Sequence, residues 1–325
     1  MYEYRVHRTP DGIAIRAEGL GKRYGDLWAL RDLDLEVPAG SVLGLLGHNG
    51  AGKTTAIRIL TTLTAPTTGY ATVAGLDVVA DAKQVRSRIG LAGQNAAVDD
   101  LLTARANLEM IGRLYHLPRT AARARASELL ERFDLAGDVD RLVREFSGGM
   151  RRRLDLAAAL VASPPVLFLD EPTTGLDPRS RNELWALLSE LVDDGATLVL
   201  TTQYLEEADH LADEIIVLDH GRIAAEGTPA GLKERVARER VTLTVPSADQ
   251  LTAAERALAP FADGPETRDD DALTLTMPVV RGTRLVELVR TLDAAGVEVT
   301  DVSRSEPTLD DVFLVLTDPT RKAAA

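Results

Sequence analysis

The sequence predicts an α/β protein, with a first domain built on a mostly parallel β-sheet and a second, small α+β domain. Two observations predict this fold class. Short apolar runs of strand type alternate with amphipathic helical patterns, and strands joined through helices form parallel sheets that are covered on both faces. After about residue 236 the pattern changes to short alternating strands and two amphipathic helices, which indicates a separate domain, of ferredoxin-like type.

Six strand-like segments are expected in the first domain. They are residues 13–20, 33–37, 41–47, 165–170, 197–203 and 214–227. The first two alternate apolar and polar residues, as half-buried strands do, and the next two are apolar runs typical of buried parallel strands. The helical patterns cover residues 53–63, 107–117, 122–133, 148–162 and 180–195. The last of these is expected to begin at a serine cap, Ser180, and to stop at Gly195.

A domain boundary is expected after the charged, Thr228-capped helix that spans residues 228–240. The predicted division is an N-terminal extension at residues 1–12, a first domain at 13–235, an accessory α+β domain at 236–318 and a flexible tail at 319–325.

Composition excludes several classes of function. The 325-residue chain carries a net charge of -13, whereas proteins that grip nucleic acid need clustered Lys and Arg, so no nucleic-acid partner is expected. There are no cysteines, hence no disulfide, thiol nucleophile or thiolate metal site. No window approaches the ~20 apolar residues that cross a bilayer, so the chain is expected to be soluble, and any membrane span must come from another polypeptide.

A phosphate-binding loop is the strongest motif. In "GLLGHNGAGKTT", Gly47, Gly52, Lys53 and Thr54 satisfy G-x-x-x-x-G-K-[ST], directly after an apolar strand and directly before a helix. The glycines let backbone N–H groups surround the phosphates, the lysine reaches the β and γ oxygens, and the threonine offers a hydroxyl to Mg²⁺. The sequence therefore predicts ATP and Mg²⁺ as ligands.

Two carboxylates end the strand of "PVLFLDEP". Asp170 lies at the strand end, where a carboxylate can hold hydrated Mg²⁺, and Glu171 follows on the turn, where it can accept a proton from an attacking water. Adjacent acids after a strand are more often a solvated turn, but the phosphate loop in the same chain favours the catalytic interpretation.

A third motif, "FSGGM", places Ser147, Gly148 and Gly149 at a helix N-terminus, an arrangement suited to bind an anion. It precedes Asp170, and "TTGLDP" follows Glu171. In this order the motifs resemble the nucleotide-binding subunit of ATP-binding-cassette (ABC) proteins, over about residues 13–230. The resemblance implies a P-loop NTPase cassette with a RecA-like core, an antiparallel β subdomain and an α-helical subdomain.

The resemblance also implies roles for individual residues. The implied phosphate-loop contacts are Gly47, His48, Asn49, Gly50, Ala51, Gly52, Lys53, Thr54 and Thr55. His48 stands where many members have proline. Asp170 and Glu171 match the metal-binding aspartate and the catalytic glutamate, and Ser147, Gly148 and Gly149 match the signature motif that touches the γ-phosphate. That motif here has Phe146 and Met150 in place of the usual leucine and glutamine.

Four further positions are matched individually. Tyr24 corresponds to the aromatic residue that stacks on adenine, Gln94 to the glutamine that senses Mg²⁺ and water, and Asp177 lies in the loop that crosses the dimer interface. Gln203 occupies the place of the switch histidine. A glutamine amide can donate a hydrogen bond to the γ-phosphate but carries no proton across neutral pH. The implied catalytic set is therefore Lys53, Glu171 and Gln203, and the implied metal set is Thr54, Gln94 and Asp170.

The C-terminal segment narrows the subgroup. "GVEVTDVSRSEPTLDDVFLVLT" is similar to the end of cassette subunits from daunorubicin-resistance drug exporters. This resemblance implies an ATPase that powers efflux of a hydrophobic or amphiphilic compound, an antibiotic or drug in a self-resistance system. It also implies a homodimer of cassettes, a separate ABC-2 type permease and a place at the cytoplasmic face of the plasma membrane. The alternatives are another ABC system for import or for lipid or polysaccharide export, and a soluble ABC ATPase without a transport role.

Overall fold

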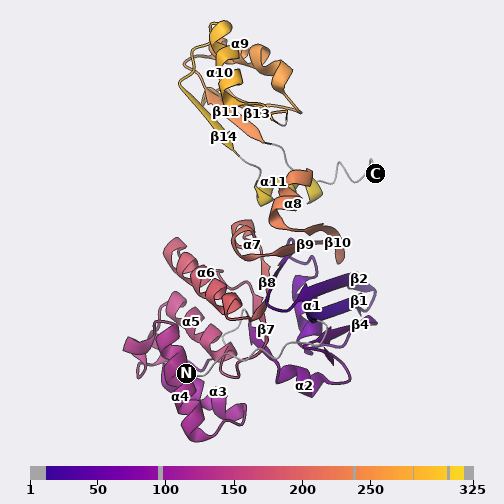
Figure 1. Ribbon diagram of the computed structural model, residues 1–325, viewed down its shortest axis with the longest axis vertical. Coiled ribbons are helices and arrows are strands. Elements are labelled where there is room, and N and C mark those ends of the chain that lie inside the picture. Colours follow the sequence, from indigo (N-terminus) through magenta and orange to yellow (C-terminus); the bar gives the residue numbers. More distant parts are fainter. Residues whose placement is uncertain (1–11, 94–97, 237–238, 281, 306–307, 318–325) are drawn as a thin grey trace. The chain divides into compact units, whose positions relative to one another are not determined.

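The computed structural model describes residues 12–93, 98–236, 239–280, 282–305 and 308–317. The chain divides into two compact units, Met1–Pro229 and Ala230–Ala325 (Figure 1). Among the described residues, no helix is both long and apolar enough to cross a membrane.

The first unit is built on a six-stranded sheet of order β10-β9-β3-β8-β7-β6. The strands in chain order are β3 (Val42–Leu46), β6 (Ile89–Ala92), β7 (Val166–Asp170), β8 (Thr197–Thr202), β9 (Glu214–Asp219) and β10 (Arg222–Gly227). The first five of these strands are parallel, and β10 pairs antiparallel with β9 at one edge. The predicted segment 214–227 is thus a hairpin of two strands.

A second, antiparallel sheet of order β2-β1-β4-β5 lies in the same unit. Its strands are β1 (Ile13–Tyr24), β2 (Leu27–Pro38), β4 (Thr68–Val73) and β5 (Leu76–Asp77). The helices of the unit are α1 (Lys53–Leu60), α2 (Ala82–Arg86), α3 (Ala104–Leu114), α4 (Arg119–Arg132), α5 (Gly148–Ala159), α6 (Pro178–Asp193) and α7 (Leu205–Leu211), with short 3₁₀ turns η1 (Ala136–Asp138) and η2 (Val143–Glu145). The short elements β4, β5, β6, α2 and α7 were not predicted.

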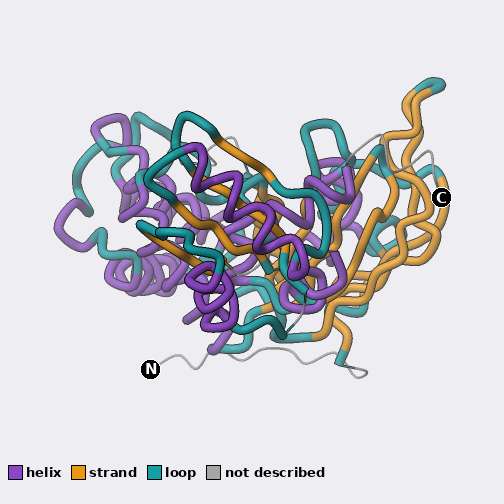
Figure 2. Tube along the Cα trace, turned by 90° about the horizontal axis from the view of Figure 1, so that it is seen from above, coloured by secondary structure: helices purple, strands orange, loops and turns teal. Residues whose placement is uncertain are grey.

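The two faces of the main sheet bury two separate hydrophobic cores. On β7, Leu167 and Leu169 pack with helices α3 to α6, whereas Val166 and Phe168 pack with α1 and the antiparallel sheet. Alternate residues of a strand point to opposite faces, so one apolar run supplies both cores. In Figure 1 the helices α3 to α6 and the strands β1, β2 and β4 accordingly lie on opposite sides of β7 and β8, and Figure 2 shows the same segregation by colour. The predicted parallel sheet covered on both faces is confirmed.

The start of helix α6 differs from the prediction. Asp177 is the N-cap, and its carboxylate accepts a hydrogen bond from the Ser180 backbone N–H, so Ser180 lies inside the first turn instead of capping it. Pro178 at the first helical position favours this register, because its fixed φ suits a helix start and its missing N–H costs nothing there. The predicted serine start was therefore wrong by one turn.

The second unit is an α+β fold. It contains β11 (Arg240–Thr244), α9 (Ala248–Leu258), the 3₁₀ turn η3 (Ala259–Phe261), β12 (Thr267–Asp269), β13 (Thr274–Pro278), α10 (Leu285–Ala294), β14 (Asp301–Ser305) and α11 (Leu309–Thr317), after the helix α8 (Pro229–Val236) at the boundary. The βαββαβ sequence with strand order β12-β13-β11-β14 is the ferredoxin-like arrangement. Its own core is centred on Leu243, Leu251, Met277 and Leu292.

Candidate nucleotide-binding site

The loop between β3 and α1 is shaped by glycines with no room for a side chain. Gly47 has φ 150°, and a Cβ there would lie 2.5 Å from the Leu218 carbonyl oxygen. Gly52 has φ 112°, and its Cβ would lie 2.7 Å from the Ala29 carbonyl oxygen. Both positions combine a left-handed backbone with a close backbone approach, which only glycine tolerates. The loop thus wraps tightly, and its N–H groups precede the positive end of α1.

Lys53 is held inside this loop. Its ammonium group donates to the carbonyl oxygens of Gly47, at 2.6 Å, and His48, at 3.2 Å, and the residue is only 5% exposed. Burial lowers the pKa of Lys53 from its ordinary value, while the nearby Glu171 and Asp170 carboxylates act in the opposite direction. A desolvated, oriented cation next to the loop is suited to bind phosphate oxygens.

A cavity of about 570 Å³ opens above the loop. Most of the predicted phosphate-loop residues line it, together with Glu171 and residues of β2 and of the β9–β10 turn. The lining residues are Leu27, Trp28, Ala29, His48, Asn49, Gly50, Ala51, Gly52, Lys53, Thr54, Thr55, Glu171 and His220. This volume lies within the usual size range of small-molecule and cofactor sites.

The two predicted acids lie where β7 ends. Asp170 is buried, and its carboxylate accepts a hydrogen bond from the Thr201 hydroxyl of the neighbouring strand β8. Glu171 has φ 51°, an unfavourable value for a residue with a side chain. Its backbone N–H donates to the Thr201 carbonyl oxygen at 2.9 Å, and its carboxylate accepts from the Thr174 hydroxyl at 3.1 Å. Thr201 therefore fixes the position of both acids.

Arg152 of helix α5 is a site residue that the sequence analysis missed. Its guanidinium donates to four backbone carbonyl oxygens, those of Gly93 (2.7 Å), Pro172 (2.7 Å), Asp170 (3.2 Å) and Glu171 (3.1 Å). Burial lowers the pKa of Arg152 from its ordinary value, but a guanidinium stays charged. Arg152 thus ties the helix that follows the signature motif to the turn that carries the acids. One arginine in a run of three gave no sequence signal for this role.

The signature residues lie at the start of α5, away from the cavity lining. Ser147 is the N-cap, and its hydroxyl accepts from the Met150 backbone N–H at 3.2 Å. Gly148 is exposed, and nothing lies within 4 Å of the place where its Cβ would be. A Cβ on Gly149 would lie 3.2 Å from the Ser180 hydroxyl of α6, so the starts of α5 and α6 are adjacent. Hydrogen bonds from Ser180 lower the pKa of the exposed Asp177 carboxyl from its ordinary value.

The remaining predicted residues lie at three places. Tyr24 is 46% exposed at the end of β1 and does not line the described part of the cavity, whereas Trp28 of β2 does. Gln203 follows β8 and is exposed, and it makes no hydrogen bond with the described residues. Gln94 lies outside the described residues, next to Gly93, whose carbonyl oxygen accepts from Arg152.

Comparison with known proteins identifies the family. The "ABC transporter" family model matches residues 30–174. A daunorubicin resistance ATP-binding protein of Streptomyces coeruleorubidus is 55% identical over 308 residues, covering 94% of this chain and 96% of that protein. The chain belongs to the ABC transporter family. Within this family, a doxorubicin resistance ATP-binding protein of Mycobacterium tuberculosis is also 48% identical, covering 95% of this chain and 96% of that protein.

A solved structure agrees with this assignment. A dimeric ATP-binding cassette in a post-hydrolysis state, bound to ADP and Pi, has a TM-score of 0.60 and 27% identity, covering 66% of this chain and 98% of that one. The predicted resemblance to ABC cassettes of the daunorubicin-resistance group is confirmed, as are the fold class and the activity. This ABC protein is the ATP-binding and ATP-hydrolysing subunit of a drug-resistance exporter, and the family implies a separate membrane subunit.

Proposed function

We propose that two copies of this chain form a head-to-tail dimer on an ABC-2 type permease at the cytoplasmic face of the plasma membrane, where they power export of an amphiphilic drug. The observation that carries the dimer is that the cavity is only half of a phosphate site. Lys53 and Glu171 line it, whereas the bare N-terminus of α5 at Ser147 and Gly148 is exposed and does not line it. A second copy would bring its α5 N-terminus to the γ-phosphate.

Residues in and beside the cavity suit Mg²⁺. Asp170 offers a buried carboxylate that the Thr201 hydroxyl already orients, and the exposed Thr54 offers a hydroxyl at the start of α1. Oxygen donors of this type are the ligands that Mg²⁺ prefers. When bound, the ion neutralises charge on the phosphate oxygens. These two residues, with Gln94 as a third candidate, are the proposed metal set.

Within the proposed dimer, each side chain of the site has a separate role. The Glu171 carboxylate accepts the proton of the attacking water, and Lys53 stabilises negative charge on the transferring phosphoryl group. Ser147 and the glycines of the facing copy donate to the same oxygens, and Asp177 lies at the dimer interface. Tyr24 or Trp28 provides the aromatic surface for adenine. ATP then closes the dimer and hydrolysis opens it, which drives the permease.

The catalytic part of the proposal is tested by Glu171→Gln. The amide keeps the size of the side chain but removes the base, so ATPase turnover should fall by about 10²- to 10⁴-fold. The variant should also elute as a dimer in size-exclusion chromatography with ATP and Mg²⁺. Glu190→Gln, the same change at an exposed position of α6, is the matched control and should hydrolyse ATP normally. Normal turnover of Glu171→Gln, or a monomer that still hydrolyses ATP, would contradict the proposal.

The export part needs the permease. The relatives are named for daunorubicin and doxorubicin resistance, so daunorubicin is the first compound to use. Cells that express the chain with its permease should accumulate less daunorubicin than cells that express Glu171→Gln with the same permease. Equal accumulation in both, with normal ATPase activity of the purified chain, would exclude this compound and would leave the ATPase assignment unaffected.

A further inference from the structure

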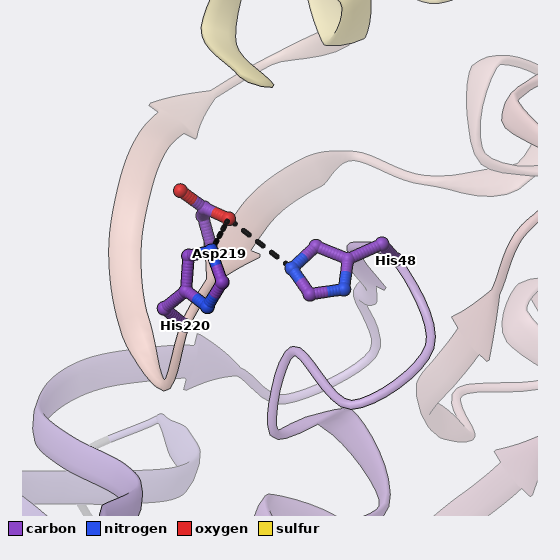
Figure 3. Close-up of side chains that lie close together, drawn as sticks. All are labelled: His48, Asp219 and His220. Atoms are coloured by element: carbon purple, nitrogen blue, oxygen red, sulfur yellow. Dashed lines mark hydrogen bonds and ion pairs between the residues drawn. The ribbon is translucent and has the colours of Figure 1, made fainter. Parts of the chain in front are cut away.

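A cluster of two histidines and an aspartate lies at the nucleotide cavity, apart from the acids that end β7, and both histidines line that cavity. His48 comes from the phosphate loop, Asp219 ends β9, and His220 is the next residue on the β9–β10 turn (Figure 3). One ligand atom from each residue can be chosen so that all of them lie within 4.8 Å of one another. None of these three residues belongs to the proposed set of Mg²⁺ ligands.

The hydrogen bonds of His48 determine which ring nitrogen carries the proton. Its Nδ1 lies 2.7 Å from the Asn49 carbonyl oxygen, which can only accept, so Nδ1 is the donor. In a neutral imidazole, Nε2 is then without a proton. This Nε2 faces the Asp219 Oδ1 at 3.2 Å (Figure 3), so two lone-pair-bearing atoms point at each other. A metal ion at this place would accept a lone pair from each of the two atoms.

His220 adds a third ligand directed at the same oxygen. Its Nε2 lies 3.7 Å from Asp219 Oδ1, and its ring centroid lies 5.2 Å from that of His48 in an edge-on arrangement. A single proton can be shared by only one of these pairs, whereas a metal ion accepts all three donors at once. The contact from His48 Nδ1–H to a backbone carbonyl is also the outer hydrogen bond that metal-ligating histidines commonly make.

The backbone around the cluster is well braced. The Gly221 N–H donates to the Ala51 carbonyl oxygen at 2.9 Å, which links the turn to the phosphate loop, and the Gly221 carbonyl oxygen accepts from the Arg31 N–H at 2.7 Å. Gly47 lies against the Leu218 carbonyl oxygen, so the loop and the end of β9 touch. His220 itself is held at φ 48°. The two segments that carry the ligands are therefore held together before any ion binds.

We propose that His48, Asp219 and His220 form a binding site for a transition-metal ion, with Zn²⁺ as its ligand. Two imidazole nitrogens and one carboxylate oxygen are a ligand set typical of Zn²⁺, whereas Mg²⁺ prefers oxygen donors alone. The His220 side chain is 82% exposed, so an ion can enter from solvent, and the fourth position is open to water. The bound ion links the phosphate loop to the β9–β10 turn.

The test is isothermal titration calorimetry of the tag-free full-length chain with ZnCl₂, without nucleotide and with excess MgCl₂ to occupy exposed carboxylates. The wild type should bind one Zn²⁺ per chain. His220→Asn removes one ligand and should weaken the affinity by about tenfold or more. Asparagine tolerates the left-handed backbone of this position, so the turn should persist.

A matched control comes from a second histidine with positive φ. His116 on the α3–α4 turn has φ 63° and is exposed, so His116→Asn makes the same chemical change outside the cluster and should leave Zn²⁺ affinity unchanged. Zn²⁺ should also raise the midpoint of thermal unfolding in the wild type and in His116→Asn, but much less in His220→Asn or in a second ligand variant, His48→Gln. If the wild type shows no saturable binding of Zn²⁺, the proposal is wrong. Unchanged Zn²⁺ binding in both His220→Asn and His48→Gln would also contradict the proposal.

Discussion

Gln203 follows strand β8 directly, and its exposed side-chain amide makes no hydrogen bond with the described residues. Because this amide can donate to a phosphate oxygen, Gln203→Ala should reduce ATPase turnover by about 100-fold, the usual cost of losing one donor to a transition state. Gln203→His restores a donor and should stay within a few-fold of the wild type, with a new titration near pH 6.5. Steady-state ATPase rates between pH 6 and 8 measure both effects.

The matched control is Gln84→Ala, the same truncation at an exposed position of α2, and it should leave turnover unchanged. A fully active Gln203→Ala variant would show that Gln203 has no role in ATP hydrolysis.

Arg152 is expected to matter for both stability and activity, because its guanidinium donates to four carbonyl oxygens around the turn that carries the proposed base. Arg152→Lys keeps the charge but cannot reproduce the planar set of donors, so it should destabilise the first unit by about 2 to 3 kcal/mol. It should also lower ATPase turnover, because the carbonyl of Glu171 loses a donor. Urea unfolding and ATPase assays measure the two losses.

The neighbouring Arg153 provides the comparison. It forms surface ion pairs with Asp134, which follows α4, and with Glu183 of α6. Exposed pairs contribute about 0 to 1 kcal/mol, so Arg153→Lys should be close to neutral. Equal losses in the two variants would argue against a special role for Arg152.

At the scale of elements, helix α5 has an N-terminus with two separable roles. Ser147 caps the helix, and it is also the proposed γ-phosphate contact of the partner's site. Ser147→Ala should therefore cost about 1 kcal/mol of stability and reduce ATPase activity. Ser147→Asp keeps a good cap but places a negative charge where phosphate should bind, so stability should be retained while activity is lost.

Helix α9 supplies the control for the cap. Ser247 caps it in the second unit by accepting from the Gln250 N–H at 3.4 Å. Ser247→Ala should lower stability similarly and leave ATPase activity unchanged. If Ser147→Asp hydrolysed ATP at the wild-type rate, the phosphate role of the α5 terminus would be wrong.

Long, strongly patterned elements could be predicted from the sequence, and short ones could not. The buried strands β3 and β7 are nearly continuous apolar runs, and β8 has an apolar centre flanked by threonines, so that burial on both faces of the sheet is visible in the sequence. The two-residue strand β5 and the five-residue helix α2 are too short to show a period. The start of α6 was misplaced because Ser180 and Asp177 are both good caps, and the choice of Asp177 depends on Pro178.

At the scale of the whole molecule, the two units have separate hydrophobic cores, and the division falls between Pro229 and Ala230. A fragment of residues 1–229 should therefore fold and bind ATP with an affinity within a few-fold of the full chain. Circular dichroism and fluorescence titration with a nucleotide analogue measure this. An unfolded or non-binding fragment would show that the nucleotide site depends on the second unit.

Contacts between residues far apart in the chain could not be predicted from the sequence. His48 was expected to contact nucleotide, but its approach to Asp219, 171 residues away, follows from the adjacency of β3 and β9 in the sheet. Arg152 reaches the turn that carries Asp170 and Glu171 for the same kind of reason, since α5 packs where β7 ends. Motifs predict which residues are chemically suited to a site, whereas the strand order decides which of them meet.

The left-handed backbone of Glu171 lowers the stability of the fold at the position of the proposed base. A side chain at φ 51° costs about 1 to 2 kcal/mol that asparagine or glycine would largely avoid. Selection for thermal stability alone would therefore favour Asn or Gly at residue 171, and such variants would lack the proposed base. If Glu171 is the base, as proposed, engineering that relieves strained backbone positions must leave this one unchanged.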